Sequence, residues 1–223
     1  MLGKTVSAID PRIMLDAYTQ GLFPMADPEH PGDLGWYRPD PRAILELDQM
    51  RLSKSLIRTV RSDRFEIRTD TCFEAVMRAC AEPAPGREET WIDDTILATY
   101  AELHRLGFAH SIEAFRNQQL VGGLYGVQIQ AAFMGESMFS RPDCGGTDAS
   151  KVCLVWLVAH LRTMGHTLLD VQWTTPHLER LGVTEISDDA YQARLATALG
   201  VQTAWGPLPQ SGQAALEALE SGS

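Results

Sequence analysis

The sequence predicts a mixed α/β protein of the α+β class, in which a mixed sheet carries helices on its faces. Between residues 65 and 139, short runs of alternating apolar and polar residues are typical of strands. The apolar run Val152–Ala159 indicates a buried helix and is too short to cross a bilayer. Residues 94–106 carry apolar side chains at helical spacing, which indicates a further amphipathic helix.

Local start and stop signals place the elements in chain order. Asp10 and Pro11 begin a helix that Gly21 ends, Asp148 and Ser187 begin two later helices, and Gly165 follows the end of the first of these. The expected elements are a helix at 10–20, irregular Pro-rich chain at 24–43, a strand at 65–69, a helix at 71–81, a loop at 82–89, a helix at 94–106, strands at 110–115, 120–130 and 131–139, a helix at 148–164, a strand at 168–173 and helices at 176–181 and 187–199.

The domain organisation is predicted from shifts in composition. A Pro-rich stretch followed by a basic helix indicates a boundary near residue 50. We therefore expect a small N-terminal domain over residues 1–50 and a larger domain over 51–205. Residues 206–223 are rich in glycine, serine and alanine, and we expect a disordered tail there.

Composition and charge exclude several classes of protein. A net charge of −10 argues against a protein that coats nucleic acid over its whole surface. The N-terminal residues lack the apolar core of a secretory signal, and the four cysteines show no CxxC spacing. We therefore expect a cytoplasmic monomer with reduced thiols that contacts no membrane.

One segment has the opposite charge. From Arg51 to Arg68, six basic residues stand against Asp63 and Glu66. Arginine suits bidentate contact with phosphate, so the segment marks where a polyanion could dock, although a solvated amphipathic helix explains the same pattern.

Several catalytic patterns are incomplete. Ser137 begins like a nucleophile elbow but has Phe139 where a glycine is required, and it does not stand before a helix. The six histidines lack metal-ligand spacing, which predicts no metal site. The stretch 162–167 resembles a coenzyme A pyrophosphate loop, but it ends a helix instead of beginning one, so Gly165 is better explained as a helix stop.

Asp170 and Gln172 stand out in an otherwise apolar strand. Alternate residues of a strand share a face, so we expect both side chains on one face, either as a structural hydrogen-bonded pair or facing a substrate across the sheet from Glu136. Gly122, Gly123 and Gly126 in a neighbouring strand suggest that a ligand approaches the sheet closely.

Six blocks of the sequence together resemble the bacterial leucyl/phenylalanyl-tRNA–protein transferases of the N-end rule. They occur in the order and with the spacing of that family over about residues 10–200. The blocks are Trp36–Arg42 (WYRPDPR), Thr90–Ile92, His110–Glu113, Leu120–Val127, Gly135–Ser140 and Asp170–Gln172.

The resemblance implies a fold and an activity. The fold would be a small N-terminal domain followed by a GNAT-like acyltransferase domain. The activity would be transfer of leucine or phenylalanine, with methionine as a further donor, from aminoacyl-tRNA to the α-amine of proteins beginning with arginine or lysine, which marks them for degradation. The family uses no metal, nucleotide or coenzyme A.

The resemblance also implies roles for individual residues. Asp170 and Gln172 would act at the reaction centre, with the Gln172 amide oxygen accepting a hydrogen bond from the attacking amine, and Glu136 would hold a positive charge nearby. The terminal adenine would stack on Trp36 and Trp91, and tRNA phosphates would contact Lys54, Arg58, Arg61 and Arg64. The donor amino acid would bind at Leu124, Gly135, Ser137, Met138 and Leu169.

Three alternatives use the same features differently. An acyl-coenzyme A acyltransferase requires a pyrophosphate loop before a helix, and the sequence has none. A leucyltransferase for proteins beginning with aspartate or glutamate requires a basic acceptor pocket, against which Glu136 argues. A non-enzymatic RNA-binding module would explain the basic segment and both tryptophans, but not the polar pair in an apolar strand.

Overall fold

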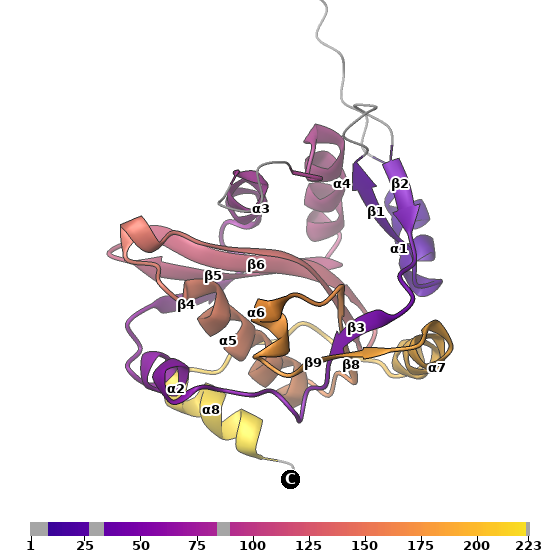
Figure 1. Cartoon of the computed structure of the whole chain (residues 1–223). Coiled ribbons are helices and arrows are strands. Elements are labelled where there is room, and N and C mark those ends of the chain that lie inside the picture. The colour runs from indigo at the N-terminus through magenta and orange to yellow at the C-terminus, as the bar shows by residue number, and fades with distance from the viewer. Residues whose placement is uncertain (1–8, 27–33, 84–89, 222–223) are drawn as a thin grey trace, which may run out of the picture.

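The computed structural model describes residues 9–26, 34–83 and 90–221, and these residues form two sheets (Figure 1). Strands β1 and β2 pair in a small sheet, and the other strands form a seven-stranded sheet of order β4-β5-β6-β7-β8-β3-β9. The strands are β1 (Phe23–Ala26), β2 (Leu34–Tyr37), β3 (Arg42–Leu45), β4 (Glu66–Thr69), β5 (Ala109–Arg116), β6 (Gln119–Ile129), β7 (Ala132–Ser140), β8 (Leu168–Gln172) and β9 (Val183–Ile186).

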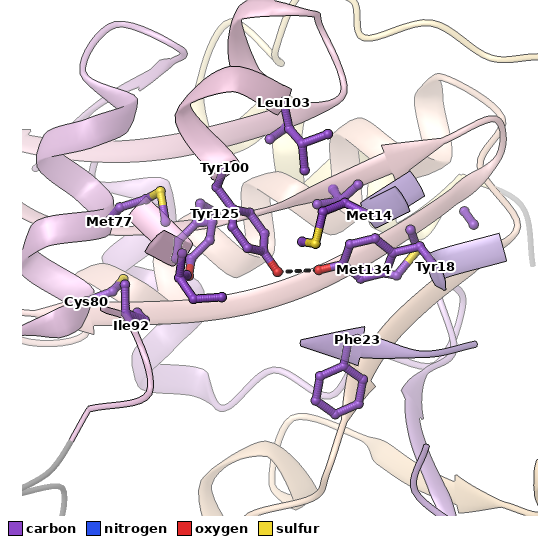
Figure 2. Packing of buried hydrophobic residues seen from close by; sticks show 14 of the residues in the cluster. Met14, Tyr18, Phe23, Met77, Cys80, Ile92, Tyr100, Leu103, Tyr125 and Met134 are labelled. Atoms are coloured by element: carbon purple, nitrogen blue, oxygen red, sulfur yellow. Dashed lines mark hydrogen bonds between the residues drawn. The ribbon is translucent and has the colours of Figure 1, made fainter. Parts of the chain in front are cut away.

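The helices cover both faces of the large sheet. One core lies under α1, α3, α4 and α7, and a second lies under α2, α5 and α8 (Figure 1). The helices are α1 (Pro11–Thr19), α2 (Lys54–Arg61), α3 (Phe73–Ala81), α4 (Asp94–Arg105), α5 (Ala149–Thr163), α6 (Pro176–Glu179), α7 (Asp188–Leu199) and α8 (Gly212–Glu220), with a 3₁₀ turn at Pro142–Cys144. Figure 2 shows part of the first core, where side chains of α1, α3 and α4 meet those of the sheet.

The large sheet is mixed, as predicted. Its strand pairs are antiparallel except β7 and β8, which are parallel and are connected through α5. A parallel pair requires such a crossover connection, and a helix that supplies it packs on the sheet. Helix α5 is accordingly buried along most of its length.

Local sequence signals place most helix ends correctly. Of the expected helix starts, Asp10 and Ser187 accept hydrogen bonds from backbone N–H groups in the first turns of α1 and α7. Asp148 precedes α5 but makes no side-chain cap hydrogen bond. Ser53 and Asp93 cap α2 and α4. Gly165 has a φ of +80° directly after α5, which confirms that it is a helix stop. No helix in the described ranges is long and apolar enough to cross a membrane.

The N-terminal segment differs from the expectation of irregular chain. Residues 23–26 and 34–37 pair as β1 and β2, and residues 42–45 enter the large sheet as β3 between β8 and β9. The break between the two sheets therefore lies between β2 and β3 and does not coincide with the boundary expected near residue 50. Residues 27–33, and residues 84–89 of the expected loop at 82–89, lie outside the described residues.

The expectation of a disordered tail after residue 205 is wrong for residues 206–221. Residues 212–220 form α8, which buries Ala215 and Leu216 against the second core. Ser211 caps the helix, and the Gly212 N–H donates to Asp63 at 2.6 Å. Apolar residues at helical spacing outweigh the small residues that suggested disorder. Residues 222 and 223 are not described.

The glycines of β6 have a packing role in place of the expected ligand contact. A Cβ on Gly122 would overlap Ala149 at the start of α5, and one on Gly126 would overlap the Met134 carbonyl and the Phe133 ring. These glycines therefore allow α5 and β7 to lie close to β6.

Glu113 of β5 also has a structural role, since its carboxylate accepts hydrogen bonds from the backbone N–H groups of Thr71 and Cys72 before α3.

Candidate active site

The site lies where β7 and β8 separate. The two parallel strands pair from Ala132 and Leu168 as far as Met134 and Asp170, but β7 continues to Ser140 without this partner. An apolar pocket of about 90 Å³ occupies the opening. It is lined by Leu124, Tyr125, Gly135, Glu136, Ser137, Met138, Leu154, Leu157, Leu169, Val171, Gln172 and Leu178. We call it the apolar pocket.

The pocket contains every residue expected to bind the donor amino acid. Leu124, Gly135, Ser137, Met138 and Leu169 all contribute to its wall. Ser137 lies inside strand β7 and not on a turn into a helix, as a nucleophile elbow requires. The pocket is thus an apolar recess with few polar groups, the usual composition of a small-ligand site.

Gln172 is held in an unusual backbone conformation at the edge of the pocket. Its φ is +57°, and the Trp173 N–H donates to the Val171 carbonyl at 2.7 Å, which closes a tight turn with Gln172 at its centre. The Gln172 residue is 6% exposed, and its amide Nε2 has no hydrogen-bond partner within the described ranges. A buried amide N–H without a partner carries a free-energy cost that a ligand could remove.

The Asp170 carboxylate stabilises this turn through a hydrogen bond. Its Oδ1 accepts hydrogen bonds from Arg42 Nε and from the Gln172 backbone N–H, both at 2.9 Å. Its Oδ2 accepts from Arg42 Nη2 at 2.6 Å and from the Tyr191 hydroxyl at 2.9 Å. Asp170 and Arg42 are almost fully buried, so the carboxylate is fully occupied by protein partners.

The expected arrangement of Asp170 and Gln172 side by side on one strand face is wrong. Ala43 and Ile44 are adjacent in β3, yet they pair with Gln172 and Asp170, so β8 has an extra residue at this point. This irregularity and the positive φ of Gln172 break the alternation of side chains. Gln172 lines the apolar pocket, whereas Asp170 contacts Arg42 and Tyr191.

Glu136 provides the titratable group of the pocket. The Tyr18 hydroxyl donates to Glu136 Oε1 at 2.7 Å and is also hydrogen-bonded to the Tyr100 hydroxyl (Figure 2). Burial, opposed by the Tyr18 hydrogen bond and assisted by the nearby Asp170 carboxylate, raises the pKa of Glu136 to about 7. Burial also raises the pKa of Tyr18, so this phenol stays protonated and can donate.

The two tryptophans lie at the same small sheet. Trp36 of β2 pairs with Pro24 of β1 and is 40% exposed. The carbonyl of Trp91 accepts a hydrogen bond from the N–H of Ala26, the last residue of β1, and the Trp91 side chain packs partly against the first core. Both tryptophans therefore adjoin the small sheet, although they are distant in sequence.

The basic segment forms an exposed helix face, as the pattern predicts. Lys54, Arg58 and Arg61 lie at helical spacing on α2 and are exposed, while Leu56 and Val60 of the same helix are buried. Arg64 follows the helix, donates to the Thr147 carbonyl and lies over the Phe65 ring.

Sequence reasoning missed the residues that hold this site. These residues are Arg42, Tyr191, Tyr18 and Tyr100. They belong to four different elements and reach the site through contacts between segments that are distant in sequence. Arg42 alone carried a signal, since it ends the WYRPDPR block. Among the described residues, no cluster of histidine, cysteine, aspartate and glutamate is placed to hold a metal ion.

Comparison with known proteins defines the class of this chain. The family model described as "Leucyl/phenylalanyl-tRNA protein transferase" matches residues 44–196, and the model of the N-terminal domain of the same family matches residues 7–40. The chain is therefore an enzyme of the acyltransferase class. It belongs to the leucyl/phenylalanyl-tRNA–protein transferase family, which confirms the resemblance found in the sequence blocks.

Relatives named leucyl/phenylalanyl-tRNA–protein transferase support this assignment. The protein of Rhizorhabdus wittichii is 53% identical over 196 residues, which cover 88% of this chain and 77% of the relative. The protein of Paramagnetospirillum magneticum is 53% identical over 86% of this chain and 90% of the relative. The protein of Rubrobacter xylanophilus is 50% identical over 88% of this chain and 98% of the relative.

Solved structures are more distant. The structure of L-PGS from Bacillus licheniformis aligns with a TM-score of 0.41 and 10% identity over 74% of this chain, and the match spans about half (51%) of that protein. A GCN5-related N-acetyltransferase-like protein from Streptococcus suis aligns with a TM-score of 0.35 and 14% identity, over 79% of this chain and 64% of that one.

Proposed function

We propose that this protein transfers leucine or phenylalanine from aminoacyl-tRNA to the α-amine of proteins that begin with arginine or lysine. Methionine is a further donor that the apolar pocket could accept. The observation that carries the proposal is an apolar pocket whose wall includes one carboxyl group, that of Glu136, and one side-chain amide, that of Gln172, beside the hydroxyl side chains of Ser137 and Tyr125. The family membership of the chain supports the donor and the reaction class.

The chemistry requires positioning more than activation. The donor is an ester, so attack by the acceptor amine forms the peptide C–N bond, breaks the ester C–O bond and returns a proton to the ribose oxygen. No energy-rich cofactor is needed for this step. The protein must hold the amine against the ester carbonyl and stabilise the negative charge that develops on the carbonyl oxygen.

Gln172 suits the stabilising role. Its unpartnered Nε2–H groups can donate to the developing oxyanion, while the amide oxygen can accept from the attacking amine. Asp170 acts as a positioning residue. Its carboxylate accepts the backbone N–H of Gln172, and Asp170 is not part of the pocket wall. Arg42 and Tyr191 fix Asp170 in turn.

Glu136 suits the recognition of an amino group. With a pKa of about 7 the carboxyl is partly ionised near neutrality, and its ionised form can accept a hydrogen bond from an α-amine at the pocket. The Tyr18 hydroxyl donates to one oxygen of this carboxylate, and Tyr100 also stabilises its ionised form.

The rest of the tRNA would lie on the surface around the site. Lys54, Arg58, Arg61 and Arg64 would contact backbone phosphates without reading bases. Trp36 and Trp91 would offer ring faces to the terminal adenine, each worth about 1–3 kcal/mol. A cytoplasmic monomer that marks its acceptors for degradation is the setting that this activity implies.

Incubation with charged tRNA tests the proposal. Purified protein is mixed with leucyl-tRNA and with reporter proteins that differ only in the first residue, namely arginine, aspartate or alanine. We expect transfer to the arginine reporter alone. Transfer to the aspartate reporter would favour the leucyltransferase of acidic acceptors, and transfer only from an acyl-coenzyme A donor would favour the other alternative. Tight tRNA binding without transfer would indicate an RNA-binding module.

A further inference from the structure

A second depression lies beside the apolar pocket, on the face of the sheet covered by α2, α5 and α6. Its volume is about 260 Å³, and its wall comes from the first turns of α2 and α5 and from α6 with the chain after it. The charged or titratable residues of the wall are Arg51, Asp148, Lys151, His177 and Arg180. We call it the cationic depression.

The two cavities share their walls. Lys151 of α5 lines the cationic depression and Leu154 lines the apolar pocket, and residues three apart on a helix lie on one face about 4.5 Å apart along the axis. In α6, the adjacent residues His177 and Leu178 divide between the two cavities in the same way. The cationic depression is therefore one helical turn from the apolar pocket.

The charges of the cationic depression leave an excess of positive charge. Lys151 Nζ is paired with Asp148 Oδ1 at 2.6 Å, so these two charges largely cancel. Burial and the nearby Lys151 ammonium lower the pKa of His177, so this imidazole is neutral at pH 7. Arg51 and Arg180 are exposed and have no acidic partner in the described part of the chain.

The surroundings favour an anion further. Helices α2 and α5 both begin at the cationic depression, and the N-terminal end of a helix carries partial positive charge. The exposed basic face of α2 continues from the same point through Lys54, Arg58 and Arg61. Positive charge thus runs from α2 through the cationic depression to the apolar pocket.

Building on the proposed function, we propose that the cationic depression binds a phosphodiester group of the single-stranded 3′ end of aminoacyl-tRNA. Arg51 and Arg180 supply the pairing charges, because a guanidinium can contact two phosphate oxygens at once. With the amino-acid side chain in the apolar pocket, the backbone linkage before the terminal nucleoside is the nearest anion of the donor. Phosphate contact here would align the ester with Gln172.

The test compares two donors that differ in this linkage. Leucyl-tRNA contains the phosphodiester, whereas the leucyl ester of adenosine lacks it. The double variant Arg51→Gln/Arg180→Gln is measured against the unmodified protein and against Arg105→Gln, a control on α4 at the other face of the sheet, where Arg105 is paired with Glu102. Both kcat/KM and the equilibrium Kd for uncharged tRNA are measured over a range of salt concentrations.

We expect kcat/KM for leucyl-tRNA to fall at least about tenfold in the double variant and the value for the adenosine ester to stay within about twofold. The slope of log Kd against log salt should become shallower by about 0.7 for each lost phosphate contact. Arg105→Gln should match the unmodified protein in every measurement.

Equal loss of rate with both donors would overturn the proposal, as would an unchanged rate and salt slope with tRNA. Absence of transfer by the unmodified protein with either donor would refute the proposed function instead. In that case the tRNA titration still decides: weaker binding with a shallower slope in the double variant supports the phosphate site, and unchanged binding overturns it.

Discussion

Arg42 and Asp170 form a buried bidentate ion pair between strands β3 and β8. Arg42 Nε donates to Asp170 Oδ1 at 2.9 Å and Nη2 donates to Oδ2 at 2.6 Å. Asp170 Oδ1 also accepts the backbone N–H of Gln172, so the pair connects the chain after the small sheet to the turn that presents the amide. The Arg42 guanidinium also lies over the ring of Tyr191, at 4.4 Å from its centroid, and over that of Phe23, at 5.0 Å.

The ion pair predicts a large effect on folding stability. Asp170→Ala leaves the buried Arg42 charge without a partner and should lower the free energy of unfolding by about 3–5 kcal/mol. Asp189→Ala removes an exposed carboxylate of the same charge on α7 and should change stability by less than about 0.5 kcal/mol. Urea titration of both variants measures the difference. A loss below about 1 kcal/mol in Asp170→Ala would contradict the structural role.

Gln172 allows its backbone and its side chain to be tested separately. Glycine adopts positive φ without steric cost, so Gln172→Gly should be more stable than Gln172→Ala by about 1 kcal/mol. Both variants lack the amide and should lose turnover alike, by about 100-fold if the amide stabilises the oxyanion. Single-turnover rates and thermal unfolding of the two variants check this. Recovery of turnover in the glycine variant would show that the side chain is dispensable.

The sequence predicted those parts of the fold that depend on local signals. The predicted caps Asp10 and Ser187 and the glycine after α5 lie at the ends of helices in the structure. Four strands, β1, β2, β3 and β9, are each only four residues long. Strand β3 in particular pairs with a strand that is distant in sequence, β8. Such short strands carry no clear period of their own.

The candidate site was predictable in its pocket lining but not in its support. The residues of the sequence blocks point to the pocket because they occur in a family order. The contacts of Arg42 with Asp170 and of Tyr18 with Glu136 join residues more than 100 positions apart, and no local sequence pattern predicts them. The break in side-chain alternation at Gln172 depends on a positive φ that glutamine rarely adopts, so strand periodicity led to the wrong face.

The pH dependence of the reaction should report on Glu136. The ionised carboxylate is the form that accepts a hydrogen bond from an amine, and its pKa of about 7 predicts that kcat/KM falls as the pH drops below 7. The Tyr18 hydroxyl stabilises the ionised form, so Tyr18→Phe should raise this pKa and move the acidic limb of the profile to higher pH.

A matched control separates this effect from general damage. Tyr37→Phe removes a hydroxyl from a residue that is 39% exposed on β2, and it should leave the position of the acidic limb unchanged. Rate profiles are measured between pH 5.5 and 9 for the three proteins. This range extends about 1.5 pH units below the expected pKa of Glu136. A Tyr18→Phe profile that coincides with the unmodified one would exclude Glu136 as the titrating group.

The C-terminal helix should contribute measurably to stability. Leu216 of α8 is 5% exposed and packs in the second core, so Leu216→Ala should cost about 2–5 kcal/mol. Leu219 lies on the same helix but is only partly buried, and Leu219→Ala should cost less. Chemical unfolding of the two variants provides the test. Equal, negligible losses would mean that α8 does not pack on α5 in solution.

Two buried histidines should make the protein sensitive to mild acid. Burial lowers the pKa of His160 and of His166 from 6.5 to about 4, so the folded state binds fewer protons than the unfolded state between these values. Stability is therefore fully present above pH 6.5 and is lost as the pH falls toward 4, by up to about 3 kcal/mol for each histidine. His160 also packs against Trp205, and His166 contacts Thr203, so protonation would act where the segment between α7 and α8 contacts α5 and the residues after it. Denaturant unfolding at pH 8, 6 and 5 should show this slope in the unmodified protein. The slope should be smaller in His166→Gln, whose own stability at pH 8 provides its reference. Equal slopes in the two proteins would show that His166 is already protonated, or fully solvated, in the folded state.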